Sequence, residues 1–175
     1  MDIVIRNAEP GELDRAGELV AATYLGDGLL TFGTEDPYLP TLRDARGRAR
    51  HAEVLVATEP AGELLGCVTF VGDGGPFANV AGPGEAEFRM LAVVPAARGR
   101  GAGEALVRAC LHRARRLGQR RVVLSSQSRM HTAHRLYTRL GFVRAPERDW
   151  EAVPGFPLHV FARELADEGD EQHNI

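Results

Sequence analysis

The sequence predicts an α/β domain in which a mixed central sheet of about six or seven strands is flanked by about four helices. Segments with strand patterns alternate with segments with helix patterns, and hairpin patterns stand at both ends of this series. The length of 175 residues is that of one ordinary domain. We therefore predict a single domain over residues 1–165, and we expect the acidic, polar residues 166–175 to form a disordered tail.

In the N-terminal half, the spacing of apolar residues predicts helices and short apolar runs predict strands. Apolar residues recur every three or four positions from Leu13 to Tyr24, which is typical of a helix. An Arg-rich segment further on has weak caps but also favours a helix. Short apolar runs bounded by Gly and Pro favour strands. The predicted elements are a strand at 2–6, a helix at 13–24, a loop at 26–40, a helix at 41–51, strands at 54–57 and 64–71 joined by a turn at 60–63, and a loop at 72–84.

The C-terminal half begins with the strand expected at the centre of the sheet, residues 86–94, which Pro95 ends. A clear amphipathic pattern follows, and a later helix closes at Gly141, a typical residue just past a helix end. The predicted elements after the central strand are a helix at 101–118, a strand at 122–125, a helix at 132–140, and a hairpin built from 142–144 and 158–163.

Composition excludes several classes of protein. No apolar run approaches the ~20 residues that cross a bilayer, and residues 1–6 lack the features of a signal peptide, so we expect a cytoplasmic protein without a membrane span. The two cysteines, Cys67 and Cys110, match neither a disulfide framework nor a metal-site spacing. We expect both to be buried, and we expect no metal site.

Charge is distributed unevenly along the chain. Residues 98–148 carry 13 basic and 2 acidic side chains, and every basic residue is arginine because the sequence contains no lysine. Arginine forms bidentate contacts with phosphate groups, so this block indicates a polyanionic partner. The alternative is that many of these arginines are solvated helix faces in a protein whose composition disfavours lysine.

Residues 93–106 are predicted to form the end of a strand, a tight turn and the start of a helix, in that order. Glycines at 99, 101 and 103 allow the backbone to approach a bulky anion, and the free N–H groups at the start of the helix would face it. The phosphate loop of nucleotide hydrolases requires a lysine, which this chain lacks. The glycine spacing also disagrees with the dinucleotide-binding fingerprint. The segment therefore predicts a phosphate site of another kind.

These residues resemble the GNAT superfamily of N-acetyltransferases. Arg98, Gly101 and Gly103 fill the pyrophosphate-loop pattern of that family, and a second family pattern recurs about 35 residues later in the form Ala133, Leu136-Tyr137 and Leu140-Gly141-Phe142. The resemblance is close over 85–144. One departure is Met130, which stands where the family commonly has Asn. The hydrogen bond of that Asn is either missing or supplied by Ser126, Gln127 or His131.

The resemblance implies acetyl-coenzyme A as co-substrate and a direct attack of an amine on its thioester. Backbone groups at the end of the central strand would pair with the pantetheine arm, and their N–H groups would stabilise the oxyanion that forms. The turn and the following helix would hold the pyrophosphate. The implied cofactor-binding residues are Leu91, Ala92, Val93, Arg98, Gly99, Arg100, Gly101, Ala102, Gly103 and Glu104.

Two residues are the candidate catalytic groups. The family counterpart of Tyr137 lies near the sulfur, so Tyr137 is the expected acid for the leaving thiolate; the alternative is a core aromatic residue. Glu87 is the first candidate for the base that deprotonates the amine, and the alternative is a surface carboxylate paired with Arg89. Weaker candidates for the base are Glu85, Glu35, Asp36, His131 and His134.

Two other functions stay open at this point: a catalytically silent sensor or scaffold that binds acyl-coenzyme A, and a nucleic-acid binder, which the scarcity of aromatic residues in 98–148 disfavours.

The expected acceptor is a small-molecule or peptide amine, since acidic residues gather in the segments that line the acceptor site in the family, 24–40, 72–84 and 146–158. The resemblance also allows a homodimer.

Overall fold

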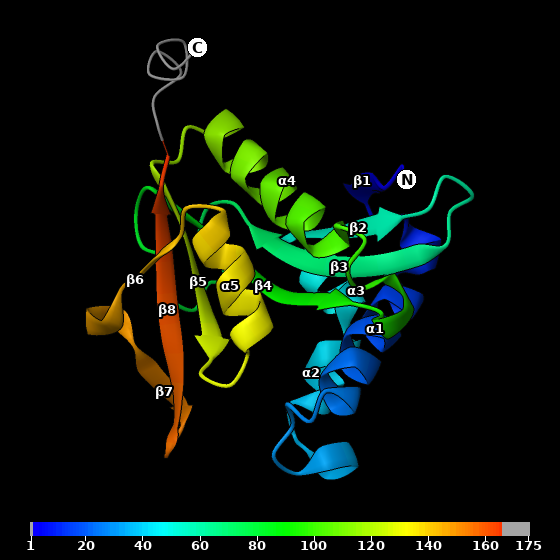
Figure 1. Ribbon diagram of the computed structural model, residues 1–175, viewed down its shortest axis with the longest axis horizontal. Helices are drawn as coiled ribbons and strands as arrows, with labels where there is room; N and C mark the ends of the chain where they lie inside the picture. Colours follow the sequence, from blue (N-terminus) through cyan, green and yellow to red (C-terminus); the bar gives the residue numbers. More distant parts are fainter. Residues whose placement is uncertain (1, 166–175) are drawn as a thin grey trace. The chain divides into compact units, whose positions relative to one another are not determined.

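The computed structural model describes residues 2–165, so the tail predicted to be disordered, 166–175, lies outside the described residues. The described chain has a mixed α/β fold with a mostly antiparallel sheet, which confirms the predicted fold class (Figure 1). It divides into two compact units. The first unit comprises 1–71 and 88–110, and the second comprises 72–87 and the residues from Leu111 onward.

The first unit holds four strands in the order β1-β2-β3-β4, together with three helices and the first part of a fourth. β1 and β2 pair antiparallel, as do β2 and β3, which form a hairpin. The elements are β1 (Val4–Asn7), α1 (Leu13–Gly26), α2 (Leu39–Arg43), α3 (Ala45–Ala49), β2 (Glu53–Thr58), β3 (Leu64–Val71), β4 (Glu85–Val93) and α4 (Ala102–Arg116). Single-turn 3-10 segments also occur at Pro10–Glu12, Gly33–Glu35 and Pro95–Ala97.

The core of the first unit is formed by the apolar faces of α1, α2 and α3 against β2, β3 and β4. Figure 1 shows α1 and α2 lying together beside these strands. The two helices approach so closely that a Cβ atom on Gly17 would lie 1.9 Å from the Arg43 carbonyl oxygen. Only glycine at position 17 allows this packing, since a side chain there would force the helices apart.

The single helix predicted at 41–51 is wrong, because the structure has two short helices, α2 and α3, that meet at Asp44. The backbone of Asp44 is not helical (φ −84°, ψ 63°), and its side chain accepts a hydrogen bond from the Gly47 N–H at 2.9 Å. Asp competes with the helix for backbone N–H groups and favours the position before a helix start. The side chain of Asp44 therefore ends one helix and begins the next.

Arg48, on α3, is fully buried in the first unit. Its guanidinium donates to the carbonyl oxygens of Thr41 (2.6 Å) and Leu42 (3.0 Å) at the end of α2. Burial lowers the pKa of Arg48, because the charged form loses its hydration. The buried cation thus closes the carbonyl end of α2, a structural role that no sequence pattern indicates.

The second unit is built on β5, which lies between two different partners. The first residues of β4 pair parallel with it (Glu85–Glu87 with Arg121–Val123), and β8 pairs with it antiparallel along its whole length. β8 also pairs with β6 and β7. The elements are β5 (Arg121–Gln127), α5 (His131–Arg139), β6 (Val143–Arg144), a 3-10 turn (Pro146–Arg148), β7 (Trp150–Val153) and β8 (Phe156–Glu164).

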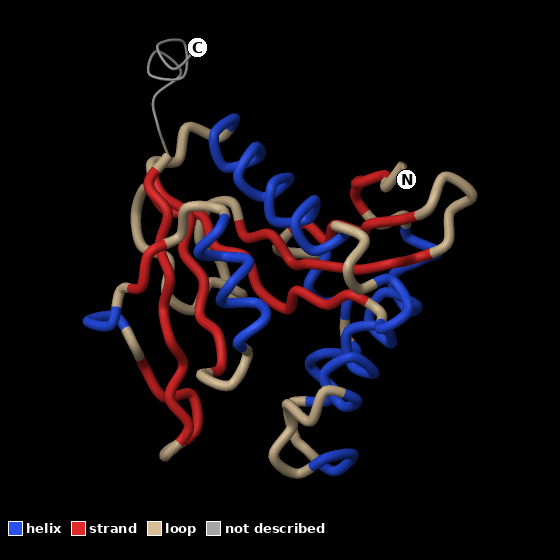
Figure 2. The backbone as a smooth tube through the Cα atoms, viewed as in Figure 1, coloured by secondary structure: helices blue, strands red, loops and turns tan. Residues whose placement is uncertain are grey.

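β7 is the strand that sequence reasoning missed, because no element was predicted between the hairpin segments 142–144 and 158–163. The structure instead has a β7–β8 hairpin, whose two strands are red and whose turn is tan in Figure 2. The turn is Pro154-Gly155, and Gly155 has a positive φ of 85°. A Pro-Gly pair between two extended segments is a turn signal, so the sequence did contain the information.

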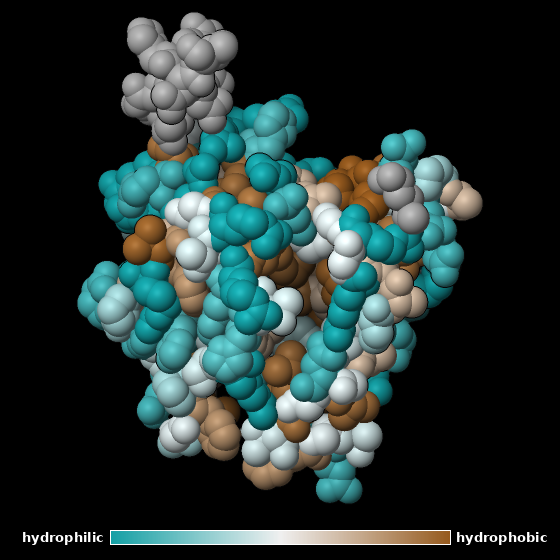
Figure 3. Space-filling view, viewed as in Figure 1, coloured by the Kyte–Doolittle hydropathy of each residue, from teal (hydrophilic) through white to brown (hydrophobic). Residues whose placement is uncertain are grey.

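Three observations concern the surface, membrane helices and the cysteines. The face drawn in Figure 3 is mostly hydrophilic. In the part of the chain that the structure describes, no helix has the length and apolar character needed to cross a membrane. Cys67 and Cys110 are both buried free thiols, which confirms that prediction, and burial raises the pKa of Cys67 to about 12.

Candidate functional site

The predicted cofactor-binding residues lie on one continuous stretch of the first unit. Leu91–Val93 end β4, Arg98–Gly101 form the turn, and Ala102–Glu104 are the first turn of α4. Gly99 (φ 80°) and Gly101 (φ 88°) both have the left-handed backbone that favours glycine. A Cβ atom built on either glycine meets no atom within 4 Å, so space is open beside the turn.

This turn leads into the N-terminus of a helix of 15 residues, α4. The first N–H groups of a helix have no partners within the helix, and they carry its positive dipole end. Open glycine backbone followed by free helical N–H groups is an arrangement that binds phosphate. The residues present therefore fit the pyrophosphate of coenzyme A.

The two arginines of the turn are each held by a carboxylate of the first unit. Arg98 Nη2 lies 2.7 Å from Asp27 Oδ2, at the end of α1, and Arg98 Nε donates to the Val93 carbonyl at 3.4 Å. Arg100 Nη2 lies 3.0 Å from Glu59 Oε1 in the β2–β3 turn. The sequence did not indicate these partners, since they are 71 and 41 residues away. They fix both guanidinium groups beside the turn.

Met90, next to the predicted pantetheine strand, has an unusual backbone. Its φ is 56°, the only positive φ at a non-glycine residue among the described residues 2–165. A left-handed conformation at such a residue costs about 1–3 kcal/mol and commonly occurs at functional sites. The side chain of Met90 is buried in the core of the first unit, which holds the residue in place. This distortion is a feature of the site that a strand pattern does not reveal.

Glu87, the candidate base, lies in the second unit and is completely buried (0% exposed). Its Oε1 accepts three backbone hydrogen bonds, from Asn79 (2.9 Å), Val80 (2.9 Å) and Ala81 (3.0 Å). Its Oε2 is buried without a hydrogen-bond partner among the described residues. One oxygen thus holds the loop at 79–81 in place, and the other is left for a proton or a ligand.

Glu85, a weaker candidate for the base, is committed to another role. Its carboxylate lies 2.8 Å from Arg148 and 2.7 Å from Arg121, and it also accepts the Gly82 N–H at 2.9 Å. The hydrogen bonds with Arg148 come first among the causes that lower the pKa of Glu85 to about 2. A carboxylate of such low pKa is a poor proton acceptor near neutral pH. Glu85 instead joins β4, β5 and the turn at 146–148.

Tyr137, the candidate acid, lies on α5 with only 3% of its surface exposed. Its ring packs against Phe142 (ring centroids 5.9 Å apart) and Phe161 (5.8 Å). Gly141, with φ 90°, closes the helix as predicted, and the Phe142 N–H donates to the Tyr137 carbonyl at 2.9 Å. The ring is therefore held firmly, which suits either a positioned acid or a core aromatic residue.

Met130 stands where the family commonly has Asn, and Ser126 forms hydrogen bonds beside it. Its Oγ lies 3.6 Å from Met130 Sδ and 3.0 Å from His134 Nε2. Of the three residues proposed to compensate for the missing Asn, His131 is exposed and Ser126 is buried. The pairing of Ser126 with His134 was not foreseen, because strand and helix patterns give no register between β5 and α5.

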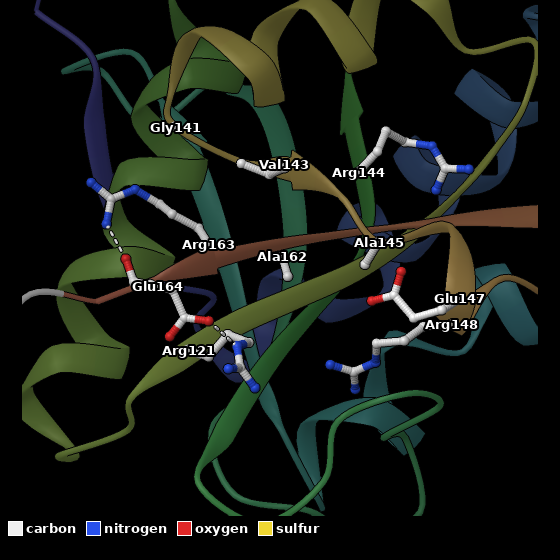
Figure 4. Close-up of a pocket in the computed structure, with 10 residues that line it drawn as sticks. All are labelled: Arg121, Gly141, Val143, Arg144, Ala145, Glu147, Arg148, Ala162, Arg163 and Glu164. Atoms are coloured by element: carbon white, nitrogen blue, oxygen red, sulfur yellow. Dashed lines mark hydrogen bonds and ion pairs between the residues drawn. The ribbon is translucent and has the colours of Figure 1, made fainter.

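Each unit also has a pocket of its own. In the second unit a pocket of about 670 Å³ is lined by Val143, Ala145 and Ala162 and by charged side chains (Figure 4). In the first unit a pocket of about 540 Å³ lies between α1 and the ends of β3 and β4. None of the predicted catalytic or cofactor-binding residues lines either pocket. Within the described residues no group of three or more His, Cys, Asp or Glu could hold a metal ion.

The chain is similar to known acetyltransferases. The profile of the Acetyltransferase (GNAT) family matches residues 20–142. No curated protein sequence matches. Among solved structures, a GNAT-family acetyltransferase from Staphylococcus aureus Mu50 superposes with a TM-score of 0.74 at 12% identity, over 94% of this chain and 100% of that one.

Two further structures are similar. The yncA protein of Salmonella typhimurium, solved with its cofactor acetyl-CoA, has a TM-score of 0.68 and 21% identity over 96% of both chains. A GCN5-related N-acetyltransferase from Kribbella flavida has a TM-score of 0.67 and 26% identity, over 93% of this chain and 98% of that one. The profile match spans most of the sequence and includes the turn at 98–101 and Tyr137, so the chain belongs to the GNAT family of acetyltransferases.

Proposed function

We propose that this protein is an N-acetyltransferase that moves the acetyl group of acetyl-coenzyme A to an amine by direct attack. The observation that carries the proposal is the strand–turn–helix at 93–104, with its open glycines and the N-terminal turn of α4. The acetyl-CoA in the Salmonella structure supports the same co-substrate. The thioester of that co-substrate supplies the activated acetyl group.

In this proposal the residues of the turn bind the pyrophosphate, with Arg98 and Arg100 beside it. The backbone of Leu91–Val93 pairs with the pantetheine arm, and its N–H groups stabilise negative charge on the carbonyl oxygen of the thioester. The left-handed Met90 supports this role, because a distortion within β4 changes the direction of the next backbone groups.

Two side chains would move protons. An amine is mostly protonated near neutral pH, and Glu87 accepts its proton through Oε2, the oxygen that has no partner among the described residues. Because Glu87 is fully buried, the proton reaches it through water or by a movement of the loop at 79–81. Tyr137 donates a proton to the thiolate that leaves.

The acceptor is a small-molecule or peptide amine. The negative charge of the expected acceptor segments is smaller than the sequence indicates, because Asp27 is paired with Arg98 and Asp149 with Arg144. The guanidinium of Arg144 holds the pKa of Asp149 at about 2. Glu35, Glu147 and Glu151 keep the preference for a cationic amine over an anionic one.

A nucleic-acid function is disfavoured by the partners of the basic block. Arg98, Arg100, Arg121, Arg144 and Arg148 each form an ion pair with a carboxylate. Arginines matched in this way neutralise fewer phosphates and release fewer counterions on binding. The remaining alternative is a silent sensor that binds acyl-coenzyme A.

Calorimetric titration with acetyl-coenzyme A, followed by thiol release against a panel of amines, tests the proposal. We expect micromolar binding that an Arg98→Ala, Gly101→Ala double variant loses, and amine-dependent thiol release that Tyr137→Phe and Glu87→Gln reduce. Binding without turnover on any amine would favour the sensor. No binding would contradict the assignment of the phosphate site.

A further inference from the structure

A serine and a histidine of the second unit form a partly buried pair that the mechanism above does not use. His134 Nε2, on α5, lies 3.0 Å from Ser126 Oγ, on β5, and Ser126 is only 5% exposed. The ring of His134 has a second hydrogen bond, to the backbone of Gln127, which favours a proton on the ring. The backbone group that does so is a carbonyl oxygen, so a ring N–H donates there. In the neutral ring that keeps this N–H, Nε2 carries no hydrogen and can accept that of the Ser126 hydroxyl.

The same ring lies beside the candidate acid. His134 precedes Tyr137 by three residues, so both side chains lie on one face of α5. Both also pack on the same side chain of β8, since the ring centroid of Phe161 lies 4.9 Å from that of His134 and 5.8 Å from that of Tyr137. The bond to Ser126 therefore ties the Tyr137 face of the helix to β5.

The charged and titratable groups around His134 come from three elements. His159 lies on β8 directly opposite Ser126, with its ring centroid 6.2 Å from that of His134. His131 lies on α5 itself at 6.3 Å, and the Arg144 guanidinium of β6 lies 5.5 Å from the ring of Phe161. Burial, followed by the charges of His159, His131 and Arg144, lowers the pKa of His134 from its usual value. His134 is therefore neutral near pH 7.

We propose that His134 is a positioning residue for Tyr137, and that its uncharged ring, bonded to Ser126, fixes the face of α5 that presents the tyrosine. This inference rests on the proposed function for its kinetic test. Protonation would turn Nε2 from an acceptor into a donor. The hydrogen of the Ser126 hydroxyl would then point toward Met130 Sδ, which lies 3.6 Å from Ser126 Oγ. It would also place a cation among His131, His159 and Arg144. The tyrosine then loses its fixed position and turnover falls.

The kinetic test compares the wild type with His134→Gln, whose side-chain oxygen can accept from Ser126 but does not titrate. We expect the kcat of the wild type to fall by up to about tenfold per pH unit below the pKa of His134. His134→Gln is expected to keep most of the kcat at alkaline pH and to lose this acid limb, while the affinity for acetyl-coenzyme A, carried by the turn at 98–104, is unchanged. The exposed His112 on α4 gives the control, since His112→Gln should keep the limb.

An acid limb that is the same in His134→Gln and the wild type would overturn the proposal. If His134→Gln fails to fold, as seen in its thermal unfolding, His134→Asn and Ser126→Ala take its place. In Ser126→Ala the neutral ring loses a donor and α5 loses its bond to β5, so kcat should fall at every pH and the acid limb that remains should move to higher pH.

A second measurement needs no turnover and separates this inference from the proposed function. The imidazole resonances of His134 and the ring resonances of Tyr137 are followed by NMR against pH in the wild type and in Ser126→Ala. We expect the Tyr137 signals to titrate together with His134, and the pKa of His134 to rise in Ser126→Ala. Tyr137 signals that ignore the titration of His134 would refute the positioning role even if the protein acetylates amines, whereas coupled signals would uphold it even if no amine is acetylated.

Discussion

At the scale of single residues, Glu85 forms two ion pairs within the second unit. Its buried carboxylate holds two guanidinium groups from different elements, Arg121 and Arg148, and the loop N–H of Gly82. Since the pKa of Glu85 is lowered to about 2, its contribution to stability is complete above the unfolded value of 4.5 and is lost as the pH falls toward 2.

We therefore predict that Glu85→Gln destabilises the protein near neutral pH by about 3–5 kcal/mol, because it leaves two arginines without their shared anion. Urea unfolding at pH 7 measures the change in the free energy of unfolding. Glu63→Gln, at an exposed position in the β2–β3 turn, serves as the control and should change it little. A Glu85→Gln variant as stable as that control would show that the ion pairs are not needed for the fold.

The glycines of the turn at 98–101, which we propose binds phosphate, give a second prediction at this scale. Gly101 has a φ of 88° with no atom in the way of a Cβ, so Gly101→Ala introduces backbone strain of about 1–2 kcal/mol without a clash. If the turn relaxes toward an ordinary φ, its N–H groups move, and we expect affinity for acetyl-coenzyme A to fall about tenfold or more.

The matched control for Gly101→Ala is Gly155→Ala in the β7–β8 turn. Gly155 has nearly the same φ, 85°, and the same open space, so both variants should lose similar stability. Calorimetric titration should show the loss of affinity for Gly101→Ala alone. Equal affinities in the two variants would mean that the turn does not bind the co-substrate.

At the scale of helices and strands, the contact between α1 and α2 is the tightest approach in the first unit that a glycine allows. Gly17→Ala would place a methyl group 1.9 Å from the Arg43 carbonyl oxygen, so the helices must separate. We predict destabilisation of about 1–3 kcal/mol or more, measured by thermal or urea unfolding. Gly26→Ala at the end of α1, where a Cβ meets nothing within 4 Å, should have a much smaller effect.

The elements also show where sequence patterns inform and where they fail. Apart from β7 and the division of α2 and α3, the order of strands and helices could be predicted, as could the loop at 72–84 and the glycine at 141, since each depends on local spacing or on a residue with special backbone freedom. The break at Asp44 was missed because a side-chain hydrogen bond overrode a helical pattern. The left-handed Met90 was missed because nothing local demands it.

The candidate site divides in the same way. The turn from Arg98 to Gly101 could be identified because its glycines and its arginine are next to one another in the sequence. The partners Asp27 and Glu59 could not be identified, since only the folded chain brings them to the arginines. The three N–H groups on Glu87 depend on the path of a loop, which no residue pattern specifies.

At the scale of the whole molecule, two elements are shared by the two compact units. β4 contributes Glu85–Glu87 to the second unit and its later residues to the first, and α4 is divided after Cys110. A strand or helix that spans a boundary is not expected to unfold at one end only. We therefore keep the prediction that residues 1–165 are a single domain, and we predict one cooperative unfolding transition.

Two probes can test this prediction. Trp150, the only tryptophan of the sequence, lies on β7 and reports on the second unit by its fluorescence. Far-UV circular dichroism is dominated by the helices, most of which belong to the first unit. Coincident urea midpoints for the two signals would support one domain, and clearly separate midpoints would show that the units unfold independently.

The ion pairs of Glu85, Asp27 and Glu59 all take their cation from arginine, in a sequence that contains no lysine. The lysine side chain is a common target of acetylation, whereas the arginine guanidinium stays protonated and is not an acceptor of this kind. When this protein is mixed with a candidate protein substrate, any acetyl-lysine that is detected must therefore belong to the substrate. Amine-directed labels will likewise leave its side chains unmodified, because the sequence contains no side chain with a primary amine.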